Sequence, residues 1–204
     1  MLRISDKWFA WLLQRVSAHH DLLLRECKRN LLGGLQGTIV EIGPGTGVNL
    51  RYYARGVRWI GFEPNLYMHP IIRREAKSLD MAIDLRRANA ETLDVESGAV
   101  DAMVSTLVLC SVANPAACLS EALRVLKPGG RFIFVEHVAA SPGTALCYVQ
   151  RAITPLWRCV GGGCNPALPA AQYLRGAGFR EVRMEEFRLP LGPSAPHIAG
   201  VAVR

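Results

Sequence analysis

Four residues at alternate positions carry the clearest chemical signal in the sequence: Glu41, Gly43, Gly45 and Gly47. They follow a β-branched run at residues 38–40 and precede residues 48–53, which can start a helix. A strand, a glycine-rich turn and a helix in this order begin many α/β folds that bind a nucleoside cofactor. Because glycine has no Cβ, its backbone can turn sharply and approach a ligand closely. These residues therefore predict a cofactor-binding loop.

The spacing of the glycines distinguishes between classes of cofactor. A dinucleotide-binding loop has the pattern G-x-G-x-x-G, but Val48 stands three residues after Gly45. The carboxylate of Glu41 would repel a pyrophosphate, whereas it suits a ligand with cationic groups. S-adenosylmethionine has an ammonium and a sulfonium group and no phosphate. We therefore expect the loop, together with Asn49 just after it, to bind S-adenosylmethionine.

A second acid, Glu63, ends the strand expected at residues 58–63, roughly twenty residues after the loop. A carboxylate there can accept hydrogen bonds from both hydroxyl groups of a ribose. Pro64 then begins a helix, since the first helical position needs no amide donor, and we place it beside the cofactor as well.

Two further segments are expected at the same end of the sheet, where loops line the ligand crevice. One follows the strand at residues 82–87, and the other ends the apolar strand within residues 100–110. The expected cofactor contacts in these segments are Ala90, Glu91, Thr106 and Leu107. For Asn89 and Glu91, contact with adenine and an ordinary role as a helix cap or loop are equal alternatives.

The other elements follow from hydrophobic periodicity and from Gly and Pro positions. Strands are expected around residues 38–42, 58–63, 82–87, 100–110, 131–137, 179–189 and 198–203, and helices around residues 5–32, 64–77, 115–126 and 170–178. The strand within 100–110 is apolar on both faces beyond Asp101, which is typical of a central parallel strand. The last two strands can form an antiparallel edge hairpin. Residues 1–204 are expected to form one domain.

Residues 140–170 differ from the rest because they mix aromatic residues, cysteines and helix breakers. An insertion after a central strand is a usual place for substrate recognition by a loop or lid. Trp157 and Cys164 are expected to line a substrate pocket with Cys110. Packing in the core is the favoured alternative for Cys110, and neither role is preferred for Cys164.

The N-terminal segment, residues 1–34, is expected to be helical, with Ser5 as its cap. The apolar run at residues 8–13 is far too short to span a bilayer. Trp8 and Trp11 would suit a peripheral contact with a membrane surface. The favoured alternative is a helical cap that lies over the cofactor cleft or packs on the domain.

Composition limits the classes of partner. The net charge of +7 is spread over successive helices, which usually means solvated faces, although a basic surface can also favour anionic membranes or nucleic acid. No arginine-rich run or aromatic stacking signature accompanies the charge, so we expect no nucleic-acid partner. We expect instead a monomer with a small-molecule substrate.

The six cysteines form no C-x-x-C pair, so we expect no metal site. The sequence has no secretory signal, and reduced thiols in a cytoplasmic protein are therefore expected.

These motifs resemble a known class of enzymes. The loop at residues 41–47, the acid Glu63 and the Leu-Lys-Pro-Gly-Gly run at residues 126–130 resemble class I S-adenosylmethionine-dependent methyltransferases. Four more stretches resemble the animal methyltransferase-like enzymes that methylate alkyl thiols at the endoplasmic reticulum and lipid droplets: residues 106–112, 136–140, 163–165 and 196–203. The likeness covers nearly everything from Gly37 to the C-terminus.

The resemblance implies a Rossmann-like, open seven-stranded α/β sheet with helices on both faces and the last strand antiparallel. It also implies that the cofactor lies across the first, second and fourth strands. The ribose-binding acid is Asp in those relatives and Glu63 here, and either carboxylate can accept both hydroxyls. The relatives carry a longer hydrophobic N-terminal anchor, which this sequence lacks, so we expect at most peripheral membrane contact.

The reaction implied is transfer of a methyl group to a small apolar thiol. The thiol must first become a thiolate, and His137 and His197 are the candidates to accept its proton. A structural hydrogen-bonding role is an equal alternative for each. The alternative functions are methylation of a quinone or a phospholipid amine at a membrane surface, and cofactor binding without turnover.

Overall fold

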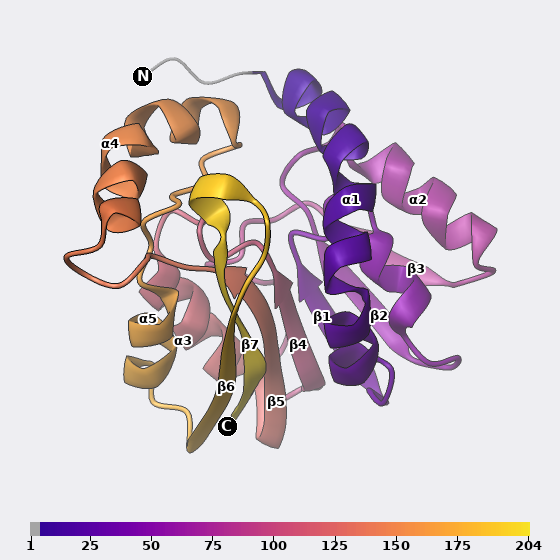
Figure 1. The fold of residues 1–204 in the computed structure, drawn as a ribbon. Helices are drawn as coiled ribbons and strands as arrows, with labels where there is room; N and C mark the ends of the chain where they lie inside the picture. The colour runs from indigo at the N-terminus through magenta and orange to yellow at the C-terminus, as the bar shows by residue number, and fades with distance from the viewer. Residues whose placement is uncertain (1–4) are drawn as a thin grey trace.

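The computed structural model describes residues 5–204, which form one seven-stranded sheet between helices (Figure 1). The strand order is β3-β2-β1-β4-β5-β7-β6. The strands are β1 Thr38–Ile42, β2 Arg58–Phe62, β3 Ile83–Arg86, β4 Val100–Thr106, β5 Leu126–His137, β6 Glu181–Arg188 and β7 Pro196–Val203. β1 to β5 pair in parallel, whereas β7 runs antiparallel to both β5 and β6. The predicted topology, including the closing antiparallel hairpin, is confirmed.

Helices cover both faces of this sheet. They are α1 Asp6–Leu32, α2 His69–Ser78, α3 Pro115–Val125, α4 Ala145–Val160 and α5 Ala170–Gly176, with short 3-10 turns η1 Val48–Tyr52 and η2 Gly192–Ser194. In Figure 1, α1 and α2 lie on one side of the sheet and α3 and α5 on the other. Three helix starts have a side-chain cap, since Ser5 accepts from the Trp8 amide, Asn114 from the Ala117 amide and Thr144 from the Cys147 amide.

Alternate residues of the central strands point to opposite faces of the sheet and pack in two separate hydrophobic layers. Val40 and Met103 belong to the layer beneath α3 and α5, whereas Ile39 and Val104 pack with Leu32 of α1. A strand with apolar residues on both faces has to be covered on both sides. The sheet therefore lies between two layers of helices.

The structure corrects three expected elements. The helix expected to begin at Pro64 begins only at His69, after a turn at residues 66–68. Residues 48–53 do not start an α-helix, because only a 3-10 turn fits before Tyr53 becomes extended and the chain enters β2 at Arg58. The face next to this turn is instead occupied by α1, which packs against η1. Residues 140–170 are not mainly loop, since they contain the 16-residue helix α4, capped by Thr144.

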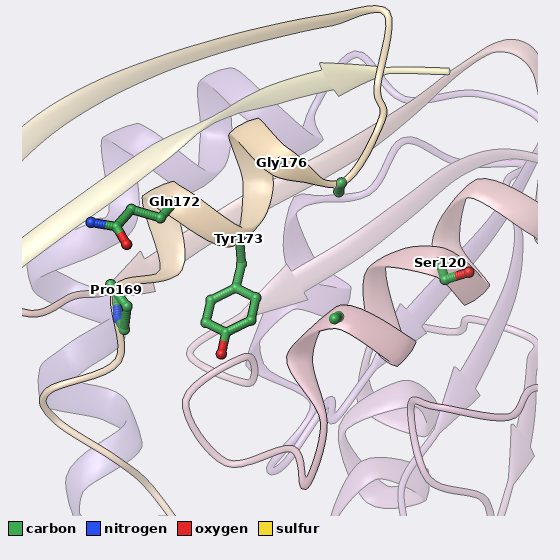
Figure 2. Close-up of a pocket in the computed structure, with 7 residues that line it drawn as sticks. Ser120, Pro169, Gln172, Tyr173 and Gly176 are labelled. Carbon is green, nitrogen blue, oxygen red and sulfur yellow. The ribbon is translucent and has the colours of Figure 1, made fainter.

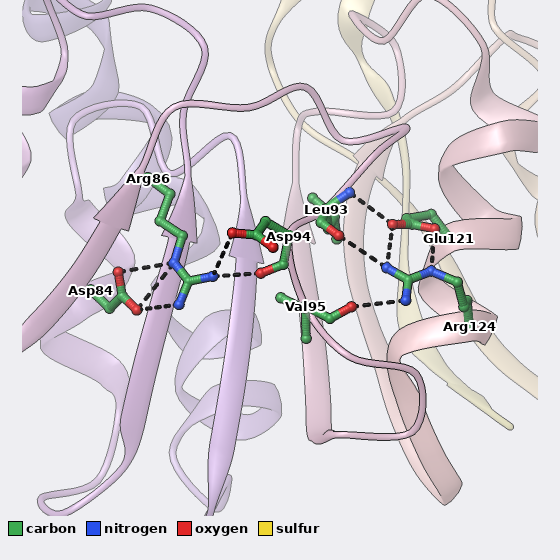
Figure 3. Close-up of polar contacts among 7 residues, drawn as sticks. All are labelled: Asp84, Arg86, Leu93, Asp94, Val95, Glu121 and Arg124. Carbon is green, nitrogen blue, oxygen red and sulfur yellow. Dashed lines mark hydrogen bonds and ion pairs between the residues drawn. The ribbon is translucent and has the colours of Figure 1, made fainter.

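Polar contacts fix the loop that follows β3 (Figure 3). Arg124 of α3 donates to the carbonyl oxygens of Leu93 and Val95 and pairs with Glu121, which also accepts from the Leu93 amide. On the other side, Arg86 pairs with Asp84 and donates to the Asp94 carbonyl oxygen. The loop that carries Glu91 is thus held between β3 and α3.

A buried ion pair attaches α1 to the sheet layer below it. Lys28 Nζ lies 2.8 Å from Asp21 Oδ1, and the Tyr52 hydroxyl donates to Asp21 Oδ2 at 3.0 Å. Both charged side chains are almost fully buried. The pair therefore joins two turns of α1 to η1.

The Asp21→Ala variant is expected to lower the free energy of unfolding by about 3–5 kcal/mol, because it leaves the Lys28 charge buried without a partner. Urea denaturation followed by circular dichroism measures this loss. Glu26→Ala, which removes an exposed acid from the same helix, should change stability by less than about 0.5 kcal/mol. Equal effects of the two substitutions would contradict a structural role for the pair.

Candidate cofactor and acceptor site

The glycine loop has the backbone geometry that its sequence predicts. Gly43, Gly45 and Gly47 have φ angles of 54°, 58° and 79°, in the left-handed region that favours glycine. A Cβ built on Gly43 would lie 2.8 Å from Val108 Cγ2, and one on Gly45 would lie 3.1 Å from Leu13 Cδ2. The loop therefore packs closely between α1 and the segment after β4.

Glu41 is the centre of a buried hydrogen-bond network. Its carboxylate is 1% exposed and accepts from Asn49 Nδ2 at 2.8 Å, the Tyr53 hydroxyl at 2.8 Å and Trp59 Nε1 at 2.9 Å. Burial raises the pKa of Glu41, and the three donors oppose this rise. Its oxygens hold η1 and β2 together, and its direct interaction with a cationic cofactor remains a prediction.

Two polar atoms beside the loop have no partner within residues 5–204. Thr46 Oγ1 and Asn49 Oδ1 are buried and make no hydrogen bond there, although Asn49 Nδ2 also donates to Thr106 Oγ1 at 3.0 Å. Buried polar atoms are normally hydrogen-bonded, so the two unsatisfied acceptors fit a site that a ligand with donor groups completes. This arrangement suits S-adenosylmethionine, with Thr46 as a contact that the sequence did not indicate.

Glu63 faces the same loop from the end of β2. Its carboxylate accepts from the Gly45 amide at 3.0 Å and the Asn65 amide at 2.9 Å. Burial raises its pKa, against the lowering effect of these two bonds. Each carboxylate oxygen keeps a lone pair for a ribose hydroxyl. Pro64, the next residue, is exposed.

Glu91, in the loop after β3, has a structural role. Glu91 Oε1 accepts from the Ala113 and Asn114 amides, at 2.8 and 3.1 Å, at the start of α3. The helix-cap alternative therefore describes its position, and contact with adenine remains a prediction. Ala90 is buried in the core below this loop.

A second buried carboxylate, Glu136, shapes the turn after β4. It accepts from Ser105 Oγ at 2.6 Å, the Val108 amide at 3.1 Å and the Leu109 amide at 3.2 Å. Burial raises its pKa. Leu107 in this turn has a φ of 58°, which is unusual for a residue with a Cβ. Sequence reasoning gave Glu136 no role; the only signal was an acid within an otherwise buried strand.

Four predicted substrate-side residues come together at the ends of β4, β5 and β7. His137 Nε2 lies 3.0 Å from Cys164 Sγ, the rings of His137 and His197 meet edge to face at 6.3 Å, and the Asn165 amide donates to the Cys110 carbonyl oxygen at 2.8 Å. Trp157 does not join this cluster, since it is half-buried in α4 next to Gly161.

The surroundings shift the pKa values of the two histidines in opposite directions. Burial lowers the pKa of His197 to about 4, and its Nδ1 donates to the Ala195 carbonyl oxygen, so that Nε2 carries no proton. For His137, burial acts against the charged form, but the contact with Cys164 outweighs it and the pKa rises. The pKa of Cys164 is also raised, by the hydrogen bond with Cys110 and by burial.

The first half of α1 covers both parts of the site. Leu13 lies over Gly45, and a Cβ built on Gly162 would lie 2.6 Å from Phe9 Cζ, so α1 also packs on the turn that carries Cys164. Asn65 Nδ2 donates to the Asp6 carbonyl oxygen at 2.9 Å and holds the start of the helix near Glu63.

A different hollow lies away from these residues. Figure 2 shows a shallow pocket of about 470 Å³ between α3 and α5, lined in part by Ser120, Pro169, Gln172 and Tyr173. None of the expected site residues lines it, so it is not part of the crevice.

Comparison with known proteins agrees with this geometry. A family model described as a methyltransferase domain matches residues 40–134. Human thiol S-methyltransferases TMT1A and TMT1B are 33% and 31% identical to the chain over 214 residues, covering 98% of this chain and 88% of each relative. The geranyl diphosphate C-methyltransferase of Streptomyces coelicolor, solved with S-adenosyl-L-homocysteine, has the same fold, with a TM-score of 0.69 and 19% identity over 94% of this chain and 84% of that one.

The fold and the glycine loop thus define an S-adenosylmethionine-dependent methyltransferase. Within this class, the chain belongs to the family that includes the two human thiol S-methyltransferases.

The Glu63→Gln variant is expected to bind S-adenosylhomocysteine roughly 10- to 150-fold more weakly, because bonds to a charged acceptor contribute about 1.5–3 kcal/mol. Isothermal titration calorimetry measures the affinity. Glu75→Gln, which alters a surface ion pair with Arg51, is the matched control and should bind normally. Unchanged affinity in Glu63→Gln would remove this acid from the site.

The wild-type affinity is also expected to depend on pH. The pKa of Glu63 is raised above 4.5 in the free protein, so the carboxylate takes up a proton at a higher pH than an ordinary glutamate. Ribose hydroxyls bind the ionised form best, and the affinity should therefore fall as the pH is lowered from about 7.5 to about 5. The Glu63→Gln variant lacks this group and should show a flatter profile.

Proposed function

We propose that the protein transfers a methyl group from S-adenosylmethionine to the sulfur of a small apolar thiol. The observation that carries the proposal is the cluster of Cys110, His137, Cys164 and His197 at the ends of β4, β5 and β7. The chain that holds it is 33% identical to a human thiol S-methyltransferase over 98% of its length. Apolar side chains of α1 and of the turn after β4, including Phe9, Leu13 and Val108, surround the approach to these groups.

The reaction needs no covalent intermediate with the protein. The acceptor sulfur forms a bond to the methyl carbon as the bond from that carbon to the sulfonium breaks, and S-adenosylhomocysteine leaves as a neutral sulfide. Holding the two sulfur atoms in line and excluding water supplies much of the acceleration. The burial of the site under α1 serves both purposes. The thiol also has to lose its proton, and His137 and His197 are the basic side chains in place.

This function is tested by incubating the purified protein with S-adenosylmethionine and a panel of alkyl and aryl thiols, with thioether formation measured by mass spectrometry. Turnover is expected with apolar thiols, together with stoichiometric S-adenosylhomocysteine. Quinols, phosphatidylethanolamine and the corresponding alcohols serve as comparison acceptors. If one of these is methylated and no thiol is, the proposed acceptor is wrong.

We further propose that this protein works in the cytoplasm in peripheral contact with anionic membranes, where apolar thiols accumulate. Trp8 and Trp11 are 52% and 46% exposed, and Tyr148, Leu156 and Val160 of α4 are exposed as well. The start of α1 and the helix α4 lie at the same end of the molecule (Figure 1). Arg15 stacks over Trp11, which combines an apolar and a cationic group as interfacial helices do. None of the helices within residues 5–204 is long and apolar enough to cross a membrane.

Replacement of Trp8 and Trp11 by serine is expected to weaken binding to phosphatidylserine-containing vesicles, measured by liposome flotation. The control is Leu22→Ser, which removes a side chain that is 56% exposed on the same helix but farther along it. Activity on a water-soluble thiol should stay unchanged in both variants. Equal flotation of all three proteins would exclude this surface as the membrane contact.

A further inference from the structure

Three soft ligand atoms from separate segments meet at the substrate side of the crevice. Cys110 follows β4, His137 ends β5, and Cys164 lies in the turn after α4. One ligand atom from each of them lies within 4.8 Å of the other two. In a tetrahedral zinc site, bond lengths of about 2.3 Å to sulfur and about 2.0–2.1 Å to nitrogen place the ligand atoms roughly 3.5–3.8 Å apart. The ligand atoms therefore need only small shifts to reach the spacing of such a site.

We propose that Cys110, His137 and Cys164 bind one Zn²⁺ ion and leave its fourth position open to the acceptor thiol. Two thiolates and an imidazole form a donor set that favours zinc over harder divalent ions. Three protein ligands with one open position are typical of catalytic rather than structural zinc. In the part of the chain that the structure describes, no fourth His, Cys, Asp or Glu joins the group.

The surroundings of His137 favour a ligand over a structural histidine. Its ring is buried, and its Nδ1 has no hydrogen-bond partner among residues 5–204, so the one polar side-chain contact of the ring there is with Cys164. A histidine kept for a structural hydrogen bond would be expected to use its buried Nδ1.

The backbone holds the two cysteines in place, and Cys110 Sγ makes only weak contacts of its own, 3.7 Å from the Leu107 carbonyl oxygen and 3.5 Å from Ser111 Oγ. The Asn165 amide donates to the Cys110 carbonyl oxygen at 2.8 Å, which ties the turn after α4 to the turn after β4. Glu136, next to His137, fixes the same β4 turn through the Val108 and Leu109 amides. Both thiols are therefore presented by segments that are fixed independently of a metal.

This inference rests on the proposed function, because it assigns the zinc ion a role toward the thiol acceptor. The acceptor R–SH replaces a water molecule at the open position, its S–H bond breaks, and the proton passes to bulk water. The metal thus takes the place of the histidine base of the proposed function, because His137 is then a zinc ligand. The zinc-bound thiolate sulfur then forms the bond to the methyl carbon while the sulfonium–methyl bond breaks. The neutral thioether leaves, and water returns to the metal. No electron is gained or lost overall, and bound zinc favours the deprotonated thiol.

The metal site is tested by competition titration of chelator-treated, full-length protein with Zn²⁺ and a chromophoric chelator. We expect one site per chain, weakened by more than roughly 100-fold in Cys110→Ser and Cys164→Ser, since loss of a ligand outweighs the 10- to 100-fold cost of losing a ligand's hydrogen-bond partner. Cys159→Ser, a half-buried cysteine outside the cluster, is the control and should bind as the wild type does. Equal zinc affinity in all four proteins would overturn the site.

Cobalt substitution gives a second readout that does not depend on how well the variants fold. Wild-type protein loaded with Co²⁺ should show sulfur-to-cobalt charge transfer and the intense visible bands of a four-coordinate ion. Addition of an alkyl thiol should shift these bands as the open position fills. Absence of charge transfer, or a disulfide between Cys110 and Cys164 found by mass spectrometry under the same reducing conditions, would contradict metal binding.

Activity separates this inference from the proposed function. Thiol methylation should be lost on chelation and restored by Zn²⁺. If the chelated, metal-free protein methylates thiols at the full rate, the zinc inference fails and the proposed function stands. A third outcome is that the cobalt protein shows charge transfer, its spectrum does not change when a thiol is added, and no thiol is methylated. In that case both the thiol acceptor and the catalytic role of the metal are wrong.

Discussion

The buried carboxylate of Glu41 is the interaction on which the cofactor half of the site depends. Removing a carboxylate from water is costly unless hydrogen-bond donors replace the solvent, and three donors from η1, Tyr53 and β2 do so here. One of them, Asn49, also bonds to Thr106 at the end of β4. The network therefore joins three neighbouring strands at the place where the glycine loop leaves the sheet. The loop keeps its open, left-handed turns because the residues on both sides of it are fixed.

Glu136 plays the corresponding part on the acceptor side. Its carboxylate gathers two backbone amides of the turn after β4 and holds Leu107 in an unfavourable backbone conformation. The turn then brings Cys110 towards His137 and the segment that carries Cys164. Two buried acids, each on a parallel strand, thus position the two halves of one crevice. The free-energy cost of their burial is offset by the donors they organise.

The helix α1 connects these halves from outside. Its first turns lie over the glycine loop through Leu13 and over the Cys164 turn through Phe9, while the buried Asp21–Lys28 pair anchors its middle. The glycine loop and the Cys164 turn therefore share one cover. Trp8 and Trp11, at its start, are 52% and 46% exposed and lie in the same turns as Phe9 and Leu13.

The sequence by itself determined the fold class, the position of most strands and the glycine loop. These depend on local patterns: the spacing of three glycines, acids at strand ends, and apolar runs long enough for central strands. It did not determine the length of η1, the helix α4, the capping role of Glu91 or the role of Glu136, since each depends on which neighbour occupies the adjacent space. The absence of C-x-x-C likewise argued against a metal site, yet His137 and Cys164 are 27 positions apart and in contact. Only the register of parallel strands and the path of the chain after α4 bring them together, because contacts between distant segments are set by tertiary packing rather than by local spacing.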